Sequence, residues 1–143
     1  MSDTEISTMW SAYAHQGSGV AIMTTVGKLI QSYTGDERVS ILNVDYIDHR
    51  EQVVQTSNEP INALRFFAAN RIFYKPENEI RLIYESLKEN EYEFFQIPVN
   101  INTLIKELRL GPNAGDDILE MIRTVVSVKG GVFPVRHSEL LYP

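Results

Sequence analysis

The central segment of the chain reads Tyr74-Lys75-Pro76-Glu77-Asn78-Glu79-Ile80-Arg81-Leu82-Ile83-Tyr84-Glu85, and the expected architecture follows from it. From Glu77 onward, residue types alternate with a period of two, which is typical of a β-strand. One face of this strand would carry Glu77, Glu79, Arg81 and Ile83, and the other face Ile80, Leu82 and Tyr84. If the charged face meets solvent it is an ordinary surface, and if it meets a cleft it is a candidate site. The sequence leaves both alternatives open.

The composition is that of a folded protein with excess negative charge. The chain has 143 residues, 43% hydrophobic and 22% charged, which fits one domain, residues 1–143, with a buried core. A net charge of −6 argues against non-specific nucleic-acid binding. The absence of cysteine excludes disulfides and thiolate metal sites. No apolar run is long enough to span a bilayer, and the three histidines are widely scattered. We therefore expect a cytoplasmic protein that binds neither membranes nor metals.

The rest of the pattern predicts an α+β fold with about four helices and a single mixed or antiparallel sheet of about five or six strands. Ser7 and Thr25 are candidate helix N-caps, and Asn100 or Asn102 caps a shorter helix. Helices are also expected from Pro60 to about Ile72 and from Asp116. Strands are expected at 19–24, 39–47, 77–85, 93–99 and 132–136, with 108–110 as either a strand or the end of the shorter helix.

Glu77 and Glu79 form the candidate catalytic pair. On a strand, side chains two residues apart share a face and lie roughly 6–7 Å apart. One carboxylate can then orient a ribose hydroxyl or a nucleophile while the other acts as a base. The alternative is a solvated charged face, because exposed Glu and Arg are common.

Trp10 and Tyr13 form the second candidate cluster. They are three residues apart on the expected N-terminal helix, so their rings would lie on one side of it. They are candidates for lining a pocket that binds a flat ligand. We favour the alternative that Trp10, the only tryptophan, packs in the core.

An ordered set of motifs resembles an uncharacterised bacterial family, domain of unknown function 2971. The motifs are Ser7-Thr8-Met9-Trp10-Ser11-Ala12-Tyr13-Ala14, Gly19-Val20, Val44-Asp45-Tyr46, Tyr74-x-x-Glu77-Asn78-Glu79-Ile80-Arg81 and Leu108-x-Leu110-Gly111. The chain departs from the family at Asn70, where a lysine is usual, and the neighbouring Arg71 is its possible substitute. The resemblance implies an N-terminally shortened version of the family domain.

The pattern of that family is similar to ADP-ribosyltransferase-like folds, in which a late strand holds the catalytic glutamate. This similarity implies that Glu79 is catalytic, that Glu77 is its partner and that NAD is the cofactor. The implied ligand-binding residues are Trp10, Tyr13, Arg71 and Arg81.

Two hypotheses from different classes follow. The first is an NAD-using transferase or glycohydrolase. The second, which we favour, is a non-catalytic protein-binding module without a cofactor, in the setting of phage–bacterium conflict. A shortened sheet has an open edge, where we expect a homodimer or a protein partner. A cleft beside Glu77 and Glu79 would favour the enzyme, and a large exposed apolar or acidic patch would favour the binding module.

Overall fold

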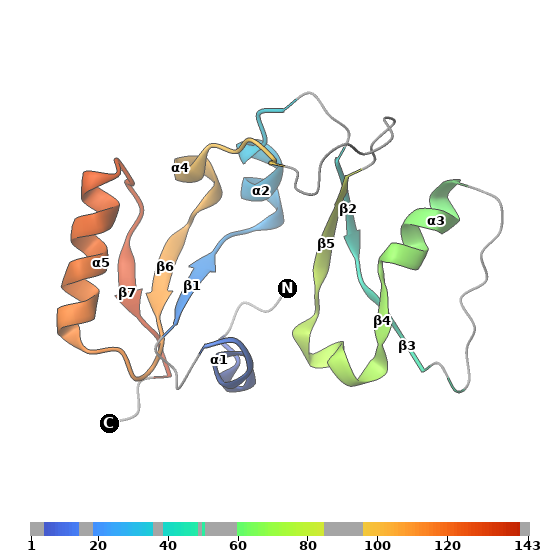
Figure 1. Cartoon of the computed structure of the whole chain (residues 1–143), viewed down its shortest axis with the longest axis horizontal. Coiled ribbons are helices and arrows are strands. Elements are labelled where there is room, and N and C mark those ends of the chain that lie inside the picture. Colours follow the sequence, from blue (N-terminus) through green and yellow to red (C-terminus); the bar gives the residue numbers. More distant parts are fainter. Residues whose placement is uncertain are drawn as a thin grey trace. The chain divides into compact units, whose positions relative to one another are not determined.

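The computed structural model describes residues 5–14, 19–35, 39–48, 50, 60–84 and 96–140. Within these ranges the fold is α+β, which confirms the predicted class, with seven strands and six helices, one of them a 3-10 helix (Figure 1). The described strands form three small sheets in place of the single sheet expected. The chain divides into a central unit, residues 36–94 with 1–3, and a terminal unit, residues 4–35 and 95–143. The single-domain organisation stays a prediction.

The terminal unit is built on a sheet of three strands, β1 (Val20–Met23), β6 (Glu107–Leu110) and β7 (Val135–His137), in the order β1-β6-β7 (Figure 1). β1 runs antiparallel to β6, and β7 runs parallel to β6. The helix α5 (Asp116–Val128) connects β6 to β7, so these three elements form a β-α-β unit. The strand alternative at 108–110 is therefore the correct one.

The sheet of the terminal unit has one apolar face and one charged face, because β6 alternates Glu107, Leu108, Arg109 and Leu110. On the apolar face, Leu108 and Leu110 pack with Leu119 of α5 in the main core cluster. Leu110 is completely buried. The charged face carries Glu107 and Arg109.

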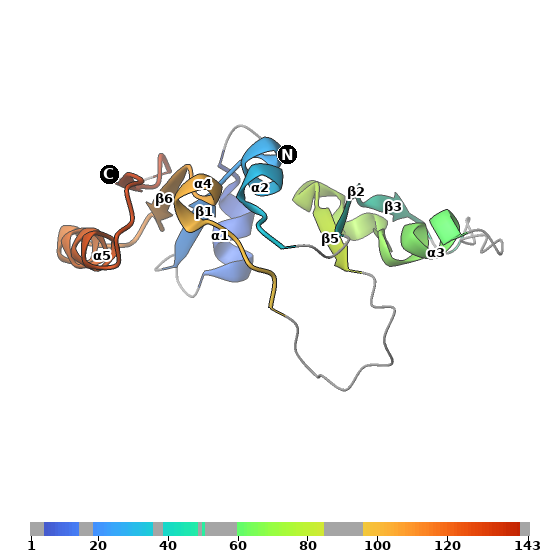
Figure 2. The same ribbon diagram turned by 90° about the horizontal axis from the view of Figure 1, so that it is seen from above.

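Two of the shorter helices of the terminal unit lie side by side (Figures 1 and 2). They are α2 (Val26–Ser32) and α4 (Ile101–Leu104). Thr25 caps α2, as predicted, because its hydroxyl accepts a hydrogen bond from the Lys28 N–H. Asn100 caps α4 by accepting from the N–H groups of Asn102 and Thr103, which settles the choice between Asn100 and Asn102.

The first helix, α1 (Ser7–Tyr13), begins one residue earlier than expected. The N-cap position belongs to Ile6, whose side chain cannot cap the helix, so the predicted cap at Ser7 is wrong. Ser7 instead accepts a hydrogen bond at its carbonyl from the Ser11 hydroxyl.

The central unit contains two strand pairs. β2 (Val39–Asn43) pairs antiparallel with β5 (Ile80–Tyr84), and β3 (Asp45–Ile47) pairs parallel with β4 (Ala69–Arg71). The strand expected over 39–47 is thus divided at Val44, which is buried and donates its N–H to the Glu79 carbonyl.

The helix predicted from Pro60 to Ile72 is shorter than expected. α3 spans Pro60–Phe67, and β4 and the 3-10 helix η2 (Ile72–Glu77) follow it. Of the strand predicted over 93–99, residues 93–95 lie outside the described residues, and Val99 forms a single bridge with Tyr33.

Candidate functional site

The two candidate catalytic carboxylates do not lie on one strand. Glu77 ends η2, and β5 begins only at Ile80. Between them Asn78 adopts a left-handed conformation, with φ 46° and ψ 51°, which asparagine tolerates better than most residues. The prediction that Glu77 and Glu79 share a strand face is therefore wrong, because Asn78 interrupts the alternation.

Arg81 holds the Glu79 carboxylate at both oxygens. Its Nε donates to Oε1 at 2.6 Å, and its Nη2 donates to Oε2 at 3.1 Å. Arg81 Nη1 donates to the carbonyl oxygens of Phe67 at 2.6 Å and Ala69 at 3.3 Å. The guanidinium thus ties β5 to the end of α3 and to β4, which is a structural role.

The same contacts set the ionisation of Glu79. The hydrogen bond from Arg81 lowers the pKa of Glu79, and the charge of Arg81 and a hydrogen bond from Asn70 lower it further against the opposing effect of burial. A carboxylate with a lowered pKa and both oxygens occupied is a poor general base. Glu79 is therefore better suited to anchoring Arg81 than to accepting a proton from a substrate.

The candidate aromatic residues belong to the terminal unit, and the candidate carboxylates belong to the central unit. Trp10 is 8% exposed and donates its Nε1 hydrogen to Glu5 at 3.1 Å, as expected for a core tryptophan. Tyr13, at 69% exposed, lies on the surface. Because the Trp10 ring is buried, it does not offer a free face on which a ligand could stack.

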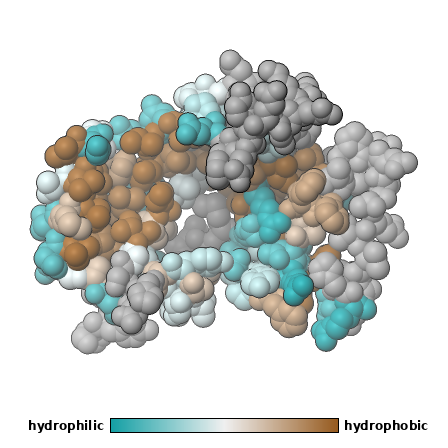
Figure 3. Space-filling model, in the orientation of Figure 1, coloured by the Kyte–Doolittle hydropathy of each residue, from teal (hydrophilic) through white to brown (hydrophobic). Residues whose placement is uncertain are grey.

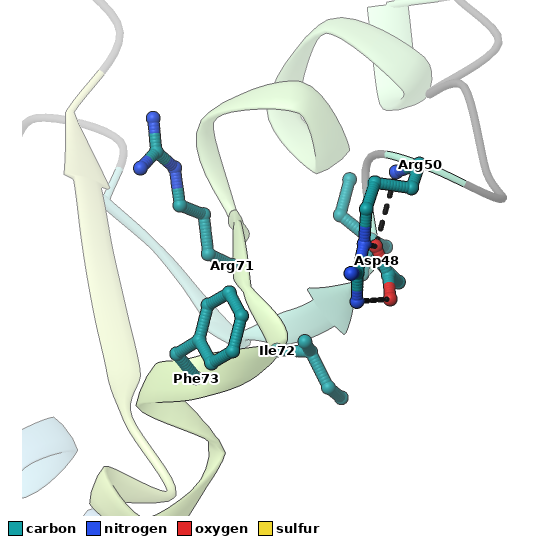
Figure 4. Close-up of a pocket in the computed structure, with 6 residues that line it drawn as sticks. Asp48, Arg50, Arg71, Ile72 and Phe73 are labelled. Carbon is teal, nitrogen blue, oxygen red and sulfur yellow. Dashed lines mark hydrogen bonds and ion pairs between the residues drawn. The ribbon is translucent and has the colours of Figure 1, made fainter.

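The central unit contains a pocket of about 430 Å³ that includes Arg71, one of the four residues implied as ligand-binding (Figure 4). Asp48 pairs with Arg50 at 2.8 Å, and Figure 4 shows Arg71 directed away from this pair. Within the described residues the Arg71 guanidinium has no hydrogen-bond or ion-pair partner. The pocket is lined by Ile47, Asp48, Arg50, Arg71, Ile72 and Phe73, so Glu77 and Glu79 are not part of it.

Sequence reasoning missed a buried ionic cluster on the charged face of the terminal sheet. Arg109 binds three carboxylates: Glu5 at 2.5 Å, Glu107 at 2.5 Å and Glu139 at 3.0 Å. The side chains of Arg109, Glu5 and Glu107 are only 14%, 5% and 9% exposed. The hydrogen bonds to Glu5 and Glu107 raise the pKa of Arg109, so its charge is fixed at any physiological pH.

Glu5 joins both ends of the chain to this cluster. Its carboxylate accepts hydrogen bonds from Trp10 Nε1, the Ser138 hydroxyl and the Glu139 N–H, in addition to Arg109. Burial raises the pKa of Glu5, but the hydrogen bonds from Ser138, Arg109, Glu139 and Trp10 outweigh it, and the pKa lies below its ordinary value of 4.5. The alternation of charged and apolar residues at 107–110 indicates that Glu107 and Arg109 share a strand face. No local sequence pattern indicates that Glu5 joins them.

The lowered pKa of Glu5 predicts a pH-dependent stability. A carboxyl whose folded pKa is lowered stabilises the fold above its unfolded pKa, and this contribution is lost as the pH falls through the folded pKa. We therefore expect the difference in unfolding free energy between wild type and Glu5→Gln to narrow below pH 4.5, the ordinary carboxyl pKa. This difference is measured by urea unfolding at each pH, followed by the fluorescence of Trp10. A difference that stays constant from neutral to acid pH would contradict this assignment.

The apolar face of the terminal sheet is only partly covered by α5. Val20 and Ile22 of β1 lie directly opposite Leu110 and Leu108, so they point to the side that α5 covers. They are nevertheless 45% and 60% exposed. Figure 3 shows hydrophobic residues gathered on this side of the terminal unit, over α5, β6 and β1.

One flank of α5 continues this apolar surface. Arg123 donates to the Val135 carbonyl, and Asp116 contacts His137 at 2.9 Å, so their flank of the helix faces β7. At 100° per residue, the opposite flank, which is turned away from β7, carries Met121, Val125 and Val128. These side chains are 53%, 49% and 78% exposed. We call the set Val20, Ile22, Met121, Val125 and Val128 the β1–α5 face.

Comparisons with protein-family models, curated proteins and solved structures found no match. The resemblance to the bacterial domain family therefore stays a prediction. No helix in the described ranges is long and apolar enough to cross a bilayer. Within the same ranges, no group of three or more His, Asp or Glu side chains is arranged to hold a metal ion.

Proposed function

We propose that this chain is a non-catalytic protein-binding module that uses the β1–α5 face. The observation that carries the proposal is the exposure of apolar side chains from two elements on one side of a single sheet. Apolar side chains gathered in this way, in contrast to scattered single ones, are typical of interaction sites. Burying such a surface contributes about 25 cal/mol per Å², which gives association a driving force that needs no catalytic group.

The candidate catalytic residues support the same conclusion. Glu79 is bound at both oxygens by Arg81, and Arg81 is in turn bound to backbone carbonyls. Glu77 is placed at the end of η2, outside β5. An acid–base pair on one strand face, the basis of the enzyme hypothesis, is not formed.

Affinity capture tests this function. The chain is the bait, and quantitative mass spectrometry identifies the proteins that it retains from the cells that express it. Ile22→Lys places a charge on the β1–α5 face, and Ile30→Lys is its matched control, because Ile30 lies on α2 and is 57% exposed against 60% for Ile22. We expect captured proteins, further copies of the chain included, to be lost with Ile22→Lys and kept with Ile30→Lys. Identical capture by wild type and Ile22→Lys would refute the proposed function.

The pocket beside Arg71 favours a second candidate function, the binding of an anionic ligand with a flat ring, such as NAD. Arg71 offers a guanidinium that no described residue pairs with, and the Phe73 ring, 77% exposed, offers a stacking surface in the same pocket. This candidate keeps Arg71 as a ligand-binding residue and places the ligand away from Glu79.

A thermal-shift titration with NAD decides between the two candidates. A ligand at about 100 times its dissociation constant stabilises the folded state by about 2.7 kcal/mol, which moves the midpoint by several degrees. The protein-binding function predicts no shift for wild type, Glu79→Gln or Arg71→Ala. A shift lost only in Arg71→Ala would support the pocket, and a shift lost in Glu79→Gln would restore the enzyme hypothesis.

A further inference from the structure

We infer that the occupant of the β1–α5 face is a second copy of the chain, docked by antiparallel pairing of β1 with β1 of the partner. This inference rests on the proposed function and names its partner. It is carried by two observations that are independent of each other: the open backbone edge of β1 and the uncovered apolar side chains beside it.

The first observation concerns the backbone of β1. The carbonyls of Gly19 and Met23 accept hydrogen bonds from residues 111 and 106, on the β6 side. Since N–H and C=O groups alternate in direction along a strand, those of Val20 and Ile22 point to the opposite side. Within the described residues these four groups have no hydrogen-bond partner.

Apart from its length of four residues, β1 has no protection in its sequence for such an edge. Natural edge strands are shielded by lysines, prolines or bulges, which prevent pairing with other chains. β1 reads Val20-Ala21-Ile22-Met23, without a charge or a proline. An unprotected edge of this kind is a template for another strand.

The hydrogen-bond pattern favours one register. The outward groups belong to Val20 and Ile22, and all of them are paired when Val20 of one copy lies opposite Ile22 of the other, with Ala21 facing Ala21 on the two-fold axis. Residues directly opposite each other point to the same face of a sheet. Val20 and Ile22 of both copies therefore gather on one face, which is the face that carries α5 in each copy.

This geometry brings together apolar side chains of β1 that the single chain leaves exposed. The two strands would join two three-stranded sheets into one, with α5 of each copy on the same face, next to β7. Val20 and Ile22 of both copies would then lie side by side at the centre of this face and cover one another in part.

Sedimentation velocity of the full chain, from low to high micromolar concentration, tests the inference together with two variants. We expect a reversible dimer for wild type and for Ile30→Lys. Ile22→Lys places an unpaired charge where the β1 strands of the two copies meet, and it is expected to raise the dissociation constant at least about tenfold. Circular dichroism and Trp10 fluorescence verify that each variant is folded.

A cysteine scan tests the register. The chain contains no cysteine, so a single introduced thiol reports only contacts between copies. In the inferred register, the two Ala21 Cα atoms lie about 4.5 Å apart, as a non-hydrogen-bonded pair, which is within disulfide range. We expect Ala21→Cys to cross-link under mild oxidation and Ile30→Cys to remain uncross-linked.

Three results would overturn the inference: a monomer at every concentration, a dimer that Ile22→Lys does not weaken, or a dimer in which Ala21→Cys does not cross-link. A monomer would refute the second copy as partner without refuting the proposed function. That function fails only if cellular capture is the same for wild type and Ile22→Lys.

Discussion

Replacing Arg109 with methionine is expected to lower the unfolding free energy of the terminal unit by about 3–5 kcal/mol, the usual cost of removing one partner from a buried ion pair. Methionine keeps much of the side-chain volume but removes the charge that Glu5 and Glu107 share. Glu5 would then be buried without a cation, and Glu107 would keep only the exposed Arg136 at 4.0 Å. Urea unfolding followed by the fluorescence of Trp10 reports on this unit directly, because Trp10 is its only tryptophan and contacts the cluster through Glu5.

Arg136→Met is the matched control for this prediction. The Arg136 side chain is 67% exposed and lies 4.0 Å from Glu107, so its loss is expected to cost less than about 1 kcal/mol, as for other exposed ion pairs. Equal losses of unfolding free energy in Arg109→Met and Arg136→Met would contradict the assignment of Arg109 to a buried ionic cluster.

The second large effect is expected at Leu110, which is 0% exposed at the centre of the core cluster. Leu110→Ala removes buried methyl groups and leaves a cavity between β6 and α5, for which we expect a loss of about 2–5 kcal/mol in unfolding free energy. Leu82→Ala in β5 is a chemically identical control at a residue that is 40% exposed. Its expected loss is smaller, and a loss at Leu82 equal to that at Leu110 would contradict the placement of the core.

The elements of the terminal unit were largely predictable because their signals are local. Thr25 caps the helix that follows it, and Asp116 begins a helix with an apolar stripe, as expected. The central unit was harder, because its pairings are not local. β4 pairs with β3 across a long segment of chain, and its sequence, Ala69-Asn70-Arg71, has no strand period, so the helix before it was extended to Ile72.

The prediction of a strand at Glu77 is wrong for a related reason. Residue types alternate from Glu77 to Ile83, but Pro76 and Asn78 are turn-forming residues, and they interrupt the strand before Ile80. The ionic cluster could not be found from local pattern, since Glu5 and Arg109 are separated by 104 positions. The β1–α5 face was missed because the exposure of Ile22 or Val128 depends on what the fold leaves uncovered.

The most direct measurement of the central claim is hydrogen–deuterium exchange at the amides of Val20 and Ile22, as a function of protein concentration. These amides point away from β6, so they exchange rapidly unless a partner strand covers them. If the chain binds through the β1–α5 face by strand pairing, their protection rises with concentration and is lost in Ile22→Lys, while that of α5 backbone amides stays constant. Rapid exchange of both amides at every concentration would contradict the pairing of β1 with a second copy.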